Sequence, residues 1–297
     1  MDETAWLDQS LAAWRLTRSE ILRAEGNPTP PTLVFYNDAC RFEGEGGPPW
    51  RSDRHDGAVA LPDGSTLPPQ VASFASPYDH GNRVFFAMAL PSIWGQAGVQ
   101  SELGLETLMT AVLIHETTHT LQYASFSHRI DAIDQRYGIG DALSDDIVQH
   151  AFRDNADYVA AYEAERDLLY RAAASSSDAE ARSLAAEALR RIEARRARFF
   201  VGDHAKLLEL EDIFLTMEGV AQWAAYLWLE RPDGRAIDRA AALLGMRRGG
   251  RQWSQDEGLA LFLVIDRLVP DWQARAFAVQ PATALELLAV AAGAPPG

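Results

Sequence analysis

Two histidines and a glutamate stand close together in the segment 113–121, whose sequence Leu-Ile-His-Glu-Thr-Thr-His-Thr-Leu contains an H-E-x-x-H motif. His115 and His119 are four residues apart, so on a helix they lie one turn apart on one face and both imidazoles can reach one metal ion. Glu116 follows the first histidine and projects beside the pair, where its carboxylate can accept a proton from metal-bound water. The motif predicts a catalytic metal site with Glu116 as its general base.

A catalytic zinc keeps three protein ligands and one open position, so a third ligand must come from elsewhere in the chain. Glu218 lies in a predicted helix and is accompanied by small residues, Gly219, Ala221 and Ala225. Glycine inside a helix costs about 1 kcal/mol relative to alanine, so its presence here indicates that another backbone approaches closely. We expect this small-residue surface to pack on the histidine-bearing helix and Glu218 to be the third ligand.

Glu211 is the alternative third ligand, because it precedes Glu218 by seven residues and falls almost on the same helical face. The two carboxylates would be separated by about 10 Å along the helix axis, so only one can be level with the imidazoles. Glu211 has no small neighbours to permit a close helix contact. We expect it to line the cleft or to orient a ligand histidine.

The donor that would stabilise a transition-state oxyanion is left open by the sequence, since several tyrosines and histidines qualify. These candidates are Tyr158, Tyr162, Tyr170, Tyr226, His150 and His204. Glu163, Glu165 and Arg166 fall in one predicted helix, where an internal ion pair or solvation is a better interpretation than catalysis.

The elements around the motif change character along the chain. Residues 5–24 have helical periodicity, whereas residues 28–91 are rich in Pro and Gly and hold short apolar runs at 32–36 and 84–88. These runs predict a small antiparallel or mixed sheet. Further helices are expected at about 102–124, 144–174, 178–200, 206–230, 235–246, 255–269 and 283–292. The sequence thus predicts an α+β protein with a sheet-containing lobe at 1–125 that ends in the H-E-x-x-H helix, and a helical lobe at 126–297.

Composition limits the classes of partner. The chain has 297 residues, 47% of them hydrophobic, and a net charge of −15, which disfavours binding to nucleic acid or to anionic membranes. Its one cysteine, Cys40, excludes an internal disulfide or a zinc-thiolate cluster. We see no targeting or membrane-spanning segment and expect a cytoplasmic protein, or an exported one if a signal peptide has been removed. The oligomeric state stays open.

Two segments, roughly 107–124 and 211–227, resemble the gluzincin-type HExxH zinc metallopeptidases, in which a glutamate on a later helix, often in an E-G-x-A sequence, completes the site. The resemblance implies a zincin-like fold, one Zn²⁺ per chain, His115, His119 and Glu218 as ligands, and Glu116 as general base. It also implies a peptide or protein substrate and makes the strand at residues 83–90 the sheet edge on which an extended peptide would lie.

The chain departs from that family in its spacing and in one segment. Glu218 follows His119 by 99 residues, which predicts a helical insertion that folds back between the two ligand helices. The G-x-M-E-N segment of the aminopeptidase branch is absent, and Gln122 and Ser125 stand where a metzincin has glycine and its third histidine. Two other functions stay open: a zinc hydrolase of a non-peptide amide, and a non-catalytic binding or scaffold protein with a vestigial metal site.

Overall fold

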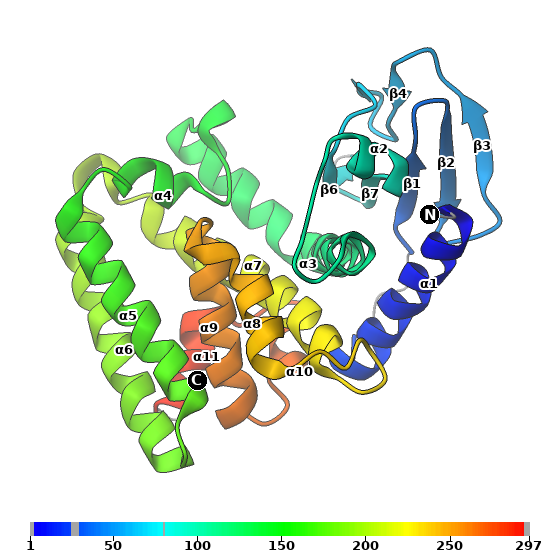
Figure 1. Ribbon diagram of the computed structural model, residues 1–297. Coiled ribbons are helices and arrows are strands. Elements are labelled where there is room, and N and C mark those ends of the chain that lie inside the picture. Colours follow the sequence, from blue (N-terminus) through cyan, green and yellow to red (C-terminus); the bar gives the residue numbers. More distant parts are fainter. Residues whose placement is uncertain (1–2, 25–29, 80, 294–297) are drawn as a thin grey trace. The chain divides into compact units, whose positions relative to one another are not determined.

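A computed structural model describes residues 3–24, 30–79 and 81–293 and has a mixed α+β fold, which confirms the predicted class (Figure 1). The chain divides into two compact units. The first comprises residues 1–127 and 224–246, and the second comprises residues 128–223 and 247–297. Among the described residues, none of the helices has the length and apolar character needed to cross a membrane.

The first unit contains a mixed five-stranded sheet with the order β3-β2-β1-β7-β6, in which β1 and β7 are parallel and the other pairs antiparallel. A separate hairpin pairs β4 with β5. The strands are β1 (Thr32–Tyr36), β2 (Cys40–Glu45), β3 (Arg51–Arg54), β4 (Val59–Ala60), β5 (Thr66–Leu67), β6 (Ser73–Tyr78) and β7 (Arg83–Ala89).

The strand at residues 83–90, expected at the sheet edge, is instead internal, because β7 pairs with β1 on one side and with β6 on the other. Its apolar run is buried from Phe85 to Ala89, as in a strand that is covered on both faces. The edge belongs to β6, whose Pro77 cannot donate a ladder hydrogen bond and suits that position. The prediction failed because an uninterrupted apolar run marks a central strand.

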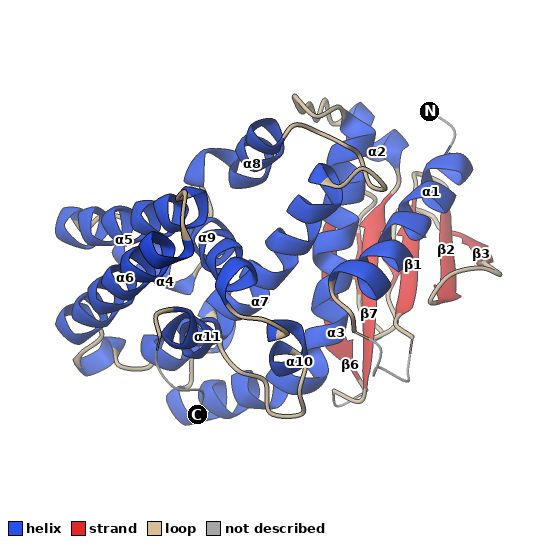
Figure 2. Ribbon diagram, turned by 90° about the horizontal axis from the view of Figure 1, so that it is seen from below, coloured by secondary structure: helices blue, strands red, loops and turns tan. Residues whose placement is uncertain are grey.

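Helices α1 (Glu3–Leu16) and α3 (Leu105–Tyr137) lie over the same face of the sheet, α3 through its N-terminal part (Figure 2). Ser10 on α1 and Thr110 on α3 form a buried hydroxyl–hydroxyl hydrogen bond of 2.8 Å. Trp6 packs edge-to-face on Phe35 of β1. On the other face, a second apolar cluster joins the hairpin to the sheet through Leu61, Val34, Phe85 and Ala87.

The second unit is helical. Its helices α5 (Ala156–Ala174) and α6 (Asp178–Phe199) run side by side in both views and supply the predicted insertion between the H-E-x-x-H helix and the Glu218 helix (Figures 1 and 2). Ser177 caps α6 by accepting a hydrogen bond from the Glu180 amide. The other α-helices in the described part of the chain are α2 (Pro91–Gln96), α4 (Ile147–Phe152), α7 (Leu207–Glu230), α8 (Arg239–Arg247), α9 (Trp253–Leu268), α10 (Trp272–Ala276) and α11 (Ala284–Ala291). Short π- or 3-10 segments occur at Thr17–Ile21, Gly140–Ala142, Gly202–His204 and Arg248–Gly250.

Candidate metal centre

The H-E-x-x-H segment lies within α3, which extends thirteen residues beyond its expected end at residue 124. The threonines in and directly after the motif are compatible with their buried surroundings because their hydroxyls donate hydrogen bonds to carbonyl groups of the same helix. Thr118 Oγ1 donates to the carbonyl of Ile114 at 2.7 Å, and Thr120 Oγ1 donates to that of Thr117 at 2.6 Å. The helix therefore buries a polar sequence without leaving these hydroxyls unsatisfied.

His115 and His119 turn the same ring nitrogen toward each other. Their Nε2 atoms are 3.1 Å apart, the rings are nearly perpendicular at 88°, and both side chains are buried. With metal–nitrogen distances of about 2.05 Å, this separation corresponds to an angle of about 98° at an ion, compared with about 109° in an ideal tetrahedron. The two imidazoles thus fit a shared divalent metal ion.

Gln122 fixes the tautomer of one imidazole. Its Oε1 lies 2.9 Å from Nδ1 of His119, and both side chains are buried. A carboxamide oxygen can only accept, so Nδ1 carries the proton and the lone pair resides on Nε2, the atom that faces His115. Sequence analysis gave Gln122 no role in the site, although its position three residues after His119 places the two side chains on one helical face.

Glu218 on α7 completes a group of three. One ligand atom from each of His115, His119 and Glu218 lies within 4.8 Å of the other two, and all three side chains are buried. Two imidazoles and a carboxylate form a donor set suited to zinc and to other divalent transition metals. When histidine, cysteine, aspartate and glutamate side chains are compared among the described residues, only these three lie close enough together to hold a metal ion.

Glu211 takes no part in that group, because two arginines on α6 hold its carboxylate. Arg195 donates to Oε1 at 2.8 Å and Arg196 donates to Oε2 at 2.6 Å, while the Tyr158 hydroxyl donates to Oε1 at 3.3 Å. These cations keep the pKa of the Glu211 carboxyl below its usual range although burial raises it. The expectation that Glu211 orients a ligand histidine is thus replaced by a role in a buried ion-pair network.

Gly219 does mark a close backbone approach, but its partner is α9 and not the histidine-bearing helix. A Cβ atom at Gly219 would lie 2.7 Å from the carbonyl oxygen of Gly258 and 2.6 Å from the ring of Phe262. The reciprocal Cβ at Gly258 would lie 2.7 Å from the backbone of Gly219. Small residues in a sequence indicate that a helix makes a close contact, but they do not indicate which helix is its partner.

Glu116 is half-buried and follows His115 directly on α3. A second carboxyl group near Glu218 belongs to Asp146, at the N-terminus of α4. Burial raises the pKa of Asp146, the nearby His150 lowers it, and the negative charge of Glu218 raises it. Asp146 therefore belongs to the electrostatic surroundings of Glu218, and the exposed His150 belongs to those of Asp146.

The tyrosine candidates for an oxyanion donor have their hydroxyls engaged in other contacts. Tyr158 contacts Glu211, Tyr162 donates to the Trp253 carbonyl at 3.3 Å, and Tyr170 donates to Asp256. Tyr226 interacts with Glu230 and Arg239, and the His204 ring packs against Phe152.

The expected internal ion pairs of α5 are present. Glu165 pairs with Arg195, and Arg166 pairs with Asp167 and Asp256.

A scan of protein-family models, a search of curated proteins and a search of solved structures each find no match to this chain.

Proposed function

We propose that the protein is a zinc-dependent peptidase that uses Glu116 as its general base. The observation that carries this proposal is the convergence of His115, His119 and Glu218 within ligand distance of one another, with a glutamate directly after the first histidine. A structural metal needs no adjacent base, so the position of Glu116 favours catalysis over a vestigial site or a scaffold.

A zinc ion held by these three side chains would act as a Lewis acid that acidifies water and polarises a carbonyl group. Glu116 accepts the proton of the attacking water and delivers it to the departing amine as the C–N bond breaks. Water is the nucleophile, so the reaction passes through no acyl-enzyme. Gln122 holds the His119 ring with Nε2 directed into the site.

The outer edge of β6, which Tyr123 contacts at one carbonyl group, supports a peptide as the substrate. The Ala89 amide donates to the Ala72 carbonyl, so the alternation of an antiparallel ladder turns the backbone groups of Ser73 and Ala75 away from β7. Tyr123, one helical turn after His119, donates its hydroxyl to the Ala75 carbonyl at 3.0 Å. The edge strand therefore lies beside the helix that carries the histidines, where an extended peptide can add as a further strand.

A peptide-library cleavage profile, paired with elemental analysis of the same preparation, tests the proposal. We expect about one zinc per chain and cleavage that stops when a chelator removes the metal and returns when zinc is restored. A panel of non-peptide amides provides the comparison. Turnover of those amides without any peptide cleavage would contradict a peptidase and favour the amide hydrolase, whereas stoichiometric metal without turnover of either class would favour a non-catalytic role.

A further inference from the structure

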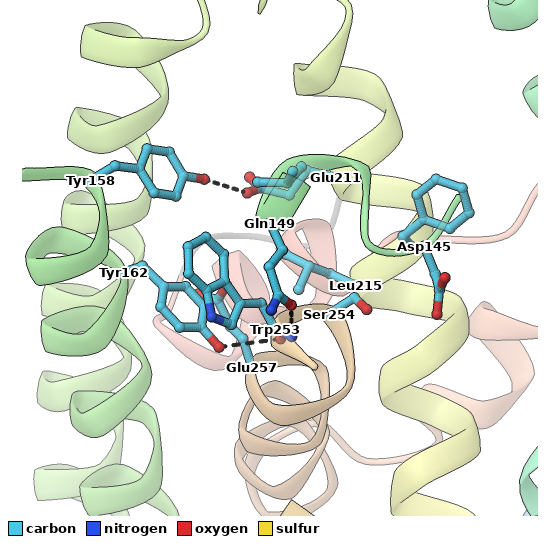
Figure 3. Close-up of a pocket in the computed structure, with 11 residues that line it drawn as sticks. Asp145, Gln149, Tyr158, Tyr162, Glu211, Leu215, Trp253, Ser254 and Glu257 are labelled. Atoms are coloured by element: carbon cyan, nitrogen blue, oxygen red, sulfur yellow. Dashed lines mark hydrogen bonds between the residues drawn. The ribbon is translucent and has the colours of Figure 1, made fainter. Parts of the chain in front are cut away.

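A small cavity lies beside the buried ion-pair network of the second unit and is lined by residues of α5, α7 and α9 and of the segment 145–149 (Figure 3). Its interior space is about 20 Å³. One water molecule needs about 10–15 Å³ of such interior space, so the cavity admits a group of about the size of one water molecule. Asp145, Gln149 and Trp253 are partly exposed, whereas Glu211 and Glu257 are buried.

Carboxylates outnumber their partners at the buried end of the cavity. Arg195, whose side chain is fully buried, pairs with Glu165 at 2.5 Å and with Glu211 at 2.8 Å, and Arg196 pairs with Glu211 as well. Glu257 also lies within the electrostatic reach of Arg195, although no ion pair to Glu257 forms among the described residues. Its carboxyl group shares a hydrogen bond with Glu165, whose pKa burial raises to about 10, and this bond lowers the pKa of Glu257. A buried carboxylate of this kind is costly unless a proton or a cation compensates it.

Two polar atoms at the cavity lack protein partners. Glu257 Oε1 and Ser254 Oγ are both buried, line the cavity, and have no hydrogen-bond partner among the described residues. The exposed fraction of Glu257 is 2% and that of Ser254 is 8%. Buried polar atoms are normally satisfied, so this pair indicates a bound group that donates hydrogen bonds.

Aromatic rings form the rest of the lining. Tyr162 and Trp253 stack with ring centroids 4.6 Å apart at 22°, and Tyr158 and Trp253 stack at 5.9 Å and 12°. Aromatic faces attract cations, and the lining residues include no lysine, arginine or histidine, although Arg195 donates hydrogen bonds to the lining residues Tyr158 and Glu211. Acidic and aromatic lining together select a compact cation over a neutral or anionic group.

We propose that this cavity binds a primary ammonium group of the substrate through Glu257 and Ser254. The ammonium group has the size of a water molecule and donates three hydrogen bonds, whereas a guanidinium group is larger and planar. This inference rests on the proposed peptidase function, because it names the substrate chemistry that the same site prefers. The net charge of −15 favours the approach of such a cation.

The position of the cavity fits a role beside the metal centre. Leu215 and Glu211 line it from α7 and share a helical face with Glu218. Leu215 precedes Glu218 by three residues, which is about 4.5 Å along the helix axis. Glu211 precedes Glu218 by seven residues, which is about 10 Å. A lysine side chain, or the amino terminus of a short peptide, spans such a distance.

Burial, the main cause, raises the pKa of Glu257 to about 7. Arg195 and a hydrogen bond with Glu165 oppose this increase, and the charge of Glu211 adds to it. A proton and an ammonium ion therefore compete for the same carboxyl group at neutral pH. The ammonium ion of a lysine side chain stays charged to about pH 10, so its binding should strengthen as Glu257 loses its proton.

Binding of n-butylammonium to the full chain tests the cavity without any need for turnover. The indole NMR signal of Trp253, assigned with Trp253→Phe, should shift in a saturable way at pH 8, while neutral n-butanol should leave it in place. Glu257→Gln should weaken the affinity about 10- to 100-fold, because a charge-assisted hydrogen bond is lost. Glu286→Gln, which can keep its capping hydrogen bond to the Thr283 amide, is the matched control and should bind as the parent does.

Three results would overturn the ammonium site: no saturable shift with n-butylammonium, equal binding of n-butanol, or unchanged affinity in Glu257→Gln with a native circular dichroism spectrum. Ser254→Ala is a second variant that removes one hydrogen-bond acceptor with little risk to the fold and should also weaken binding.

Peptide pairs identify the source of the ammonium group. Acetylation of a lysine side chain should lower kcat/KM about tenfold or more if the side chain occupies the cavity, and acetylation of the amino terminus should do so if the terminus does. No effect of either acetylation would exclude the cavity from substrate recognition. If butylammonium binds and no peptide is cleaved, the peptidase function fails while the cavity's preference for ammonium remains.

Discussion

Nδ1 of His119 donates a hydrogen bond to Oε1 of Gln122 three residues later on the same helix, at 2.9 Å. This bond commits the imidazole to the tautomer that a metal ion requires and restricts the rotation of the ring. Partners of this kind change metal affinity by about 10- to 100-fold when removed.

Gln122→Leu should therefore weaken zinc binding by about 10- to 100-fold, measured by competition with a chromophoric chelator. Gln122→Glu restores an acceptor and should bind zinc at least as tightly as the parent. Gln135→Leu, an exposed position on the same helix, is the control. Equal affinities in the parent and Gln122→Leu would show that the ring needs no such support.

Glu218→Ala and Glu211→Ala should separate two kinds of damage. Glu218→Ala should lose zinc and keep its fold, since it removes one of the three clustered ligands. Glu211→Ala should keep the ability to bind zinc but lose about 3–5 kcal/mol of unfolding free energy, because Arg195 and Arg196 lose a shared buried partner. Urea titration and chelator competition on both variants measure the two effects. Metal loss in a folded Glu211→Ala variant alone would reverse the assignment.

Glu116→Gln preserves the size of the side chain but cannot accept a proton at neutral pH. Zinc content should stay at the parental level, while kcat for a cleaved peptide should fall by about 10² or more. The comparison is made at equal zinc occupancy. A kcat within a factor of about two of the parent would remove Glu116 from the chemistry.

Glu257 should make stability depend on pH, with a sign that follows from its raised pKa. The folded state holds this proton more tightly than the unfolded state, whose reference pKa is 4.5, so the contribution is fully present below pH 4.5 and is lost as pH rises through about 7. The contribution is up to about 3 kcal/mol. Glu165, Glu211, Arg195 and Arg196 act on the same carboxyl group, and the charge of Glu257 in turn raises the pKa of Glu165, so Glu257→Gln reports on both carboxyl groups.

Glu257→Gln should accordingly flatten the profile. Between pH 5 and pH 8, the unfolding free energy from urea titration should fall less in this variant than in the parent, by up to about 3 kcal/mol. Parallel profiles in the two proteins would mean that Glu257 is ionised throughout this range.

Gly219→Ala should destabilise the second unit, because the new methyl group would meet the backbone of Gly258 at 2.7 Å. Overpacking of this kind typically costs about 1–3 kcal/mol, and Gly258→Ala should cost a similar amount. Thermal unfolding measures both. Helix propensity alone would stabilise Gly219→Ala by about 1 kcal/mol, so a net loss of stability must come from the contact with α9.

The parts of the molecule that the sequence predicted best are those set by local patterns. The H-E-x-x-H spacing places its two histidines one turn apart wherever the helix packs, and the apolar runs at 32–36 and 84–88 became the strands β1 and β7. Glu218, singled out because of the glycine that follows it, does lie with the two histidines in a group that could hold a metal ion, although that glycine packs on α9.

Long-range contacts were predicted less well. Periodicity gives the face that Gly219 presents but not the helix that it meets, so α9 could not be distinguished from α3. The sheet order was missed for the same reason, since pairing of β7 with both β1 and β6 is settled by tertiary structure. Gln122 was overlooked because a glutamine near a metal-binding motif looks like any polar helix residue until its oxygen is seen against His119.

The arrangement around Arg195 also has a consequence for how the second unit folds. This guanidinium lies on α6, and its carboxylate neighbours come from three other helices: Glu165 from α5, Glu211 from α7 and Glu257 from α9. In a partly folded state that buries Arg195 while one of these helices is detached, the positive charge of the guanidinium would lack one of its carboxylate neighbours. Such states are unfavourable, so the four helices should open together, and their slowest amides should share one hydrogen-exchange free energy.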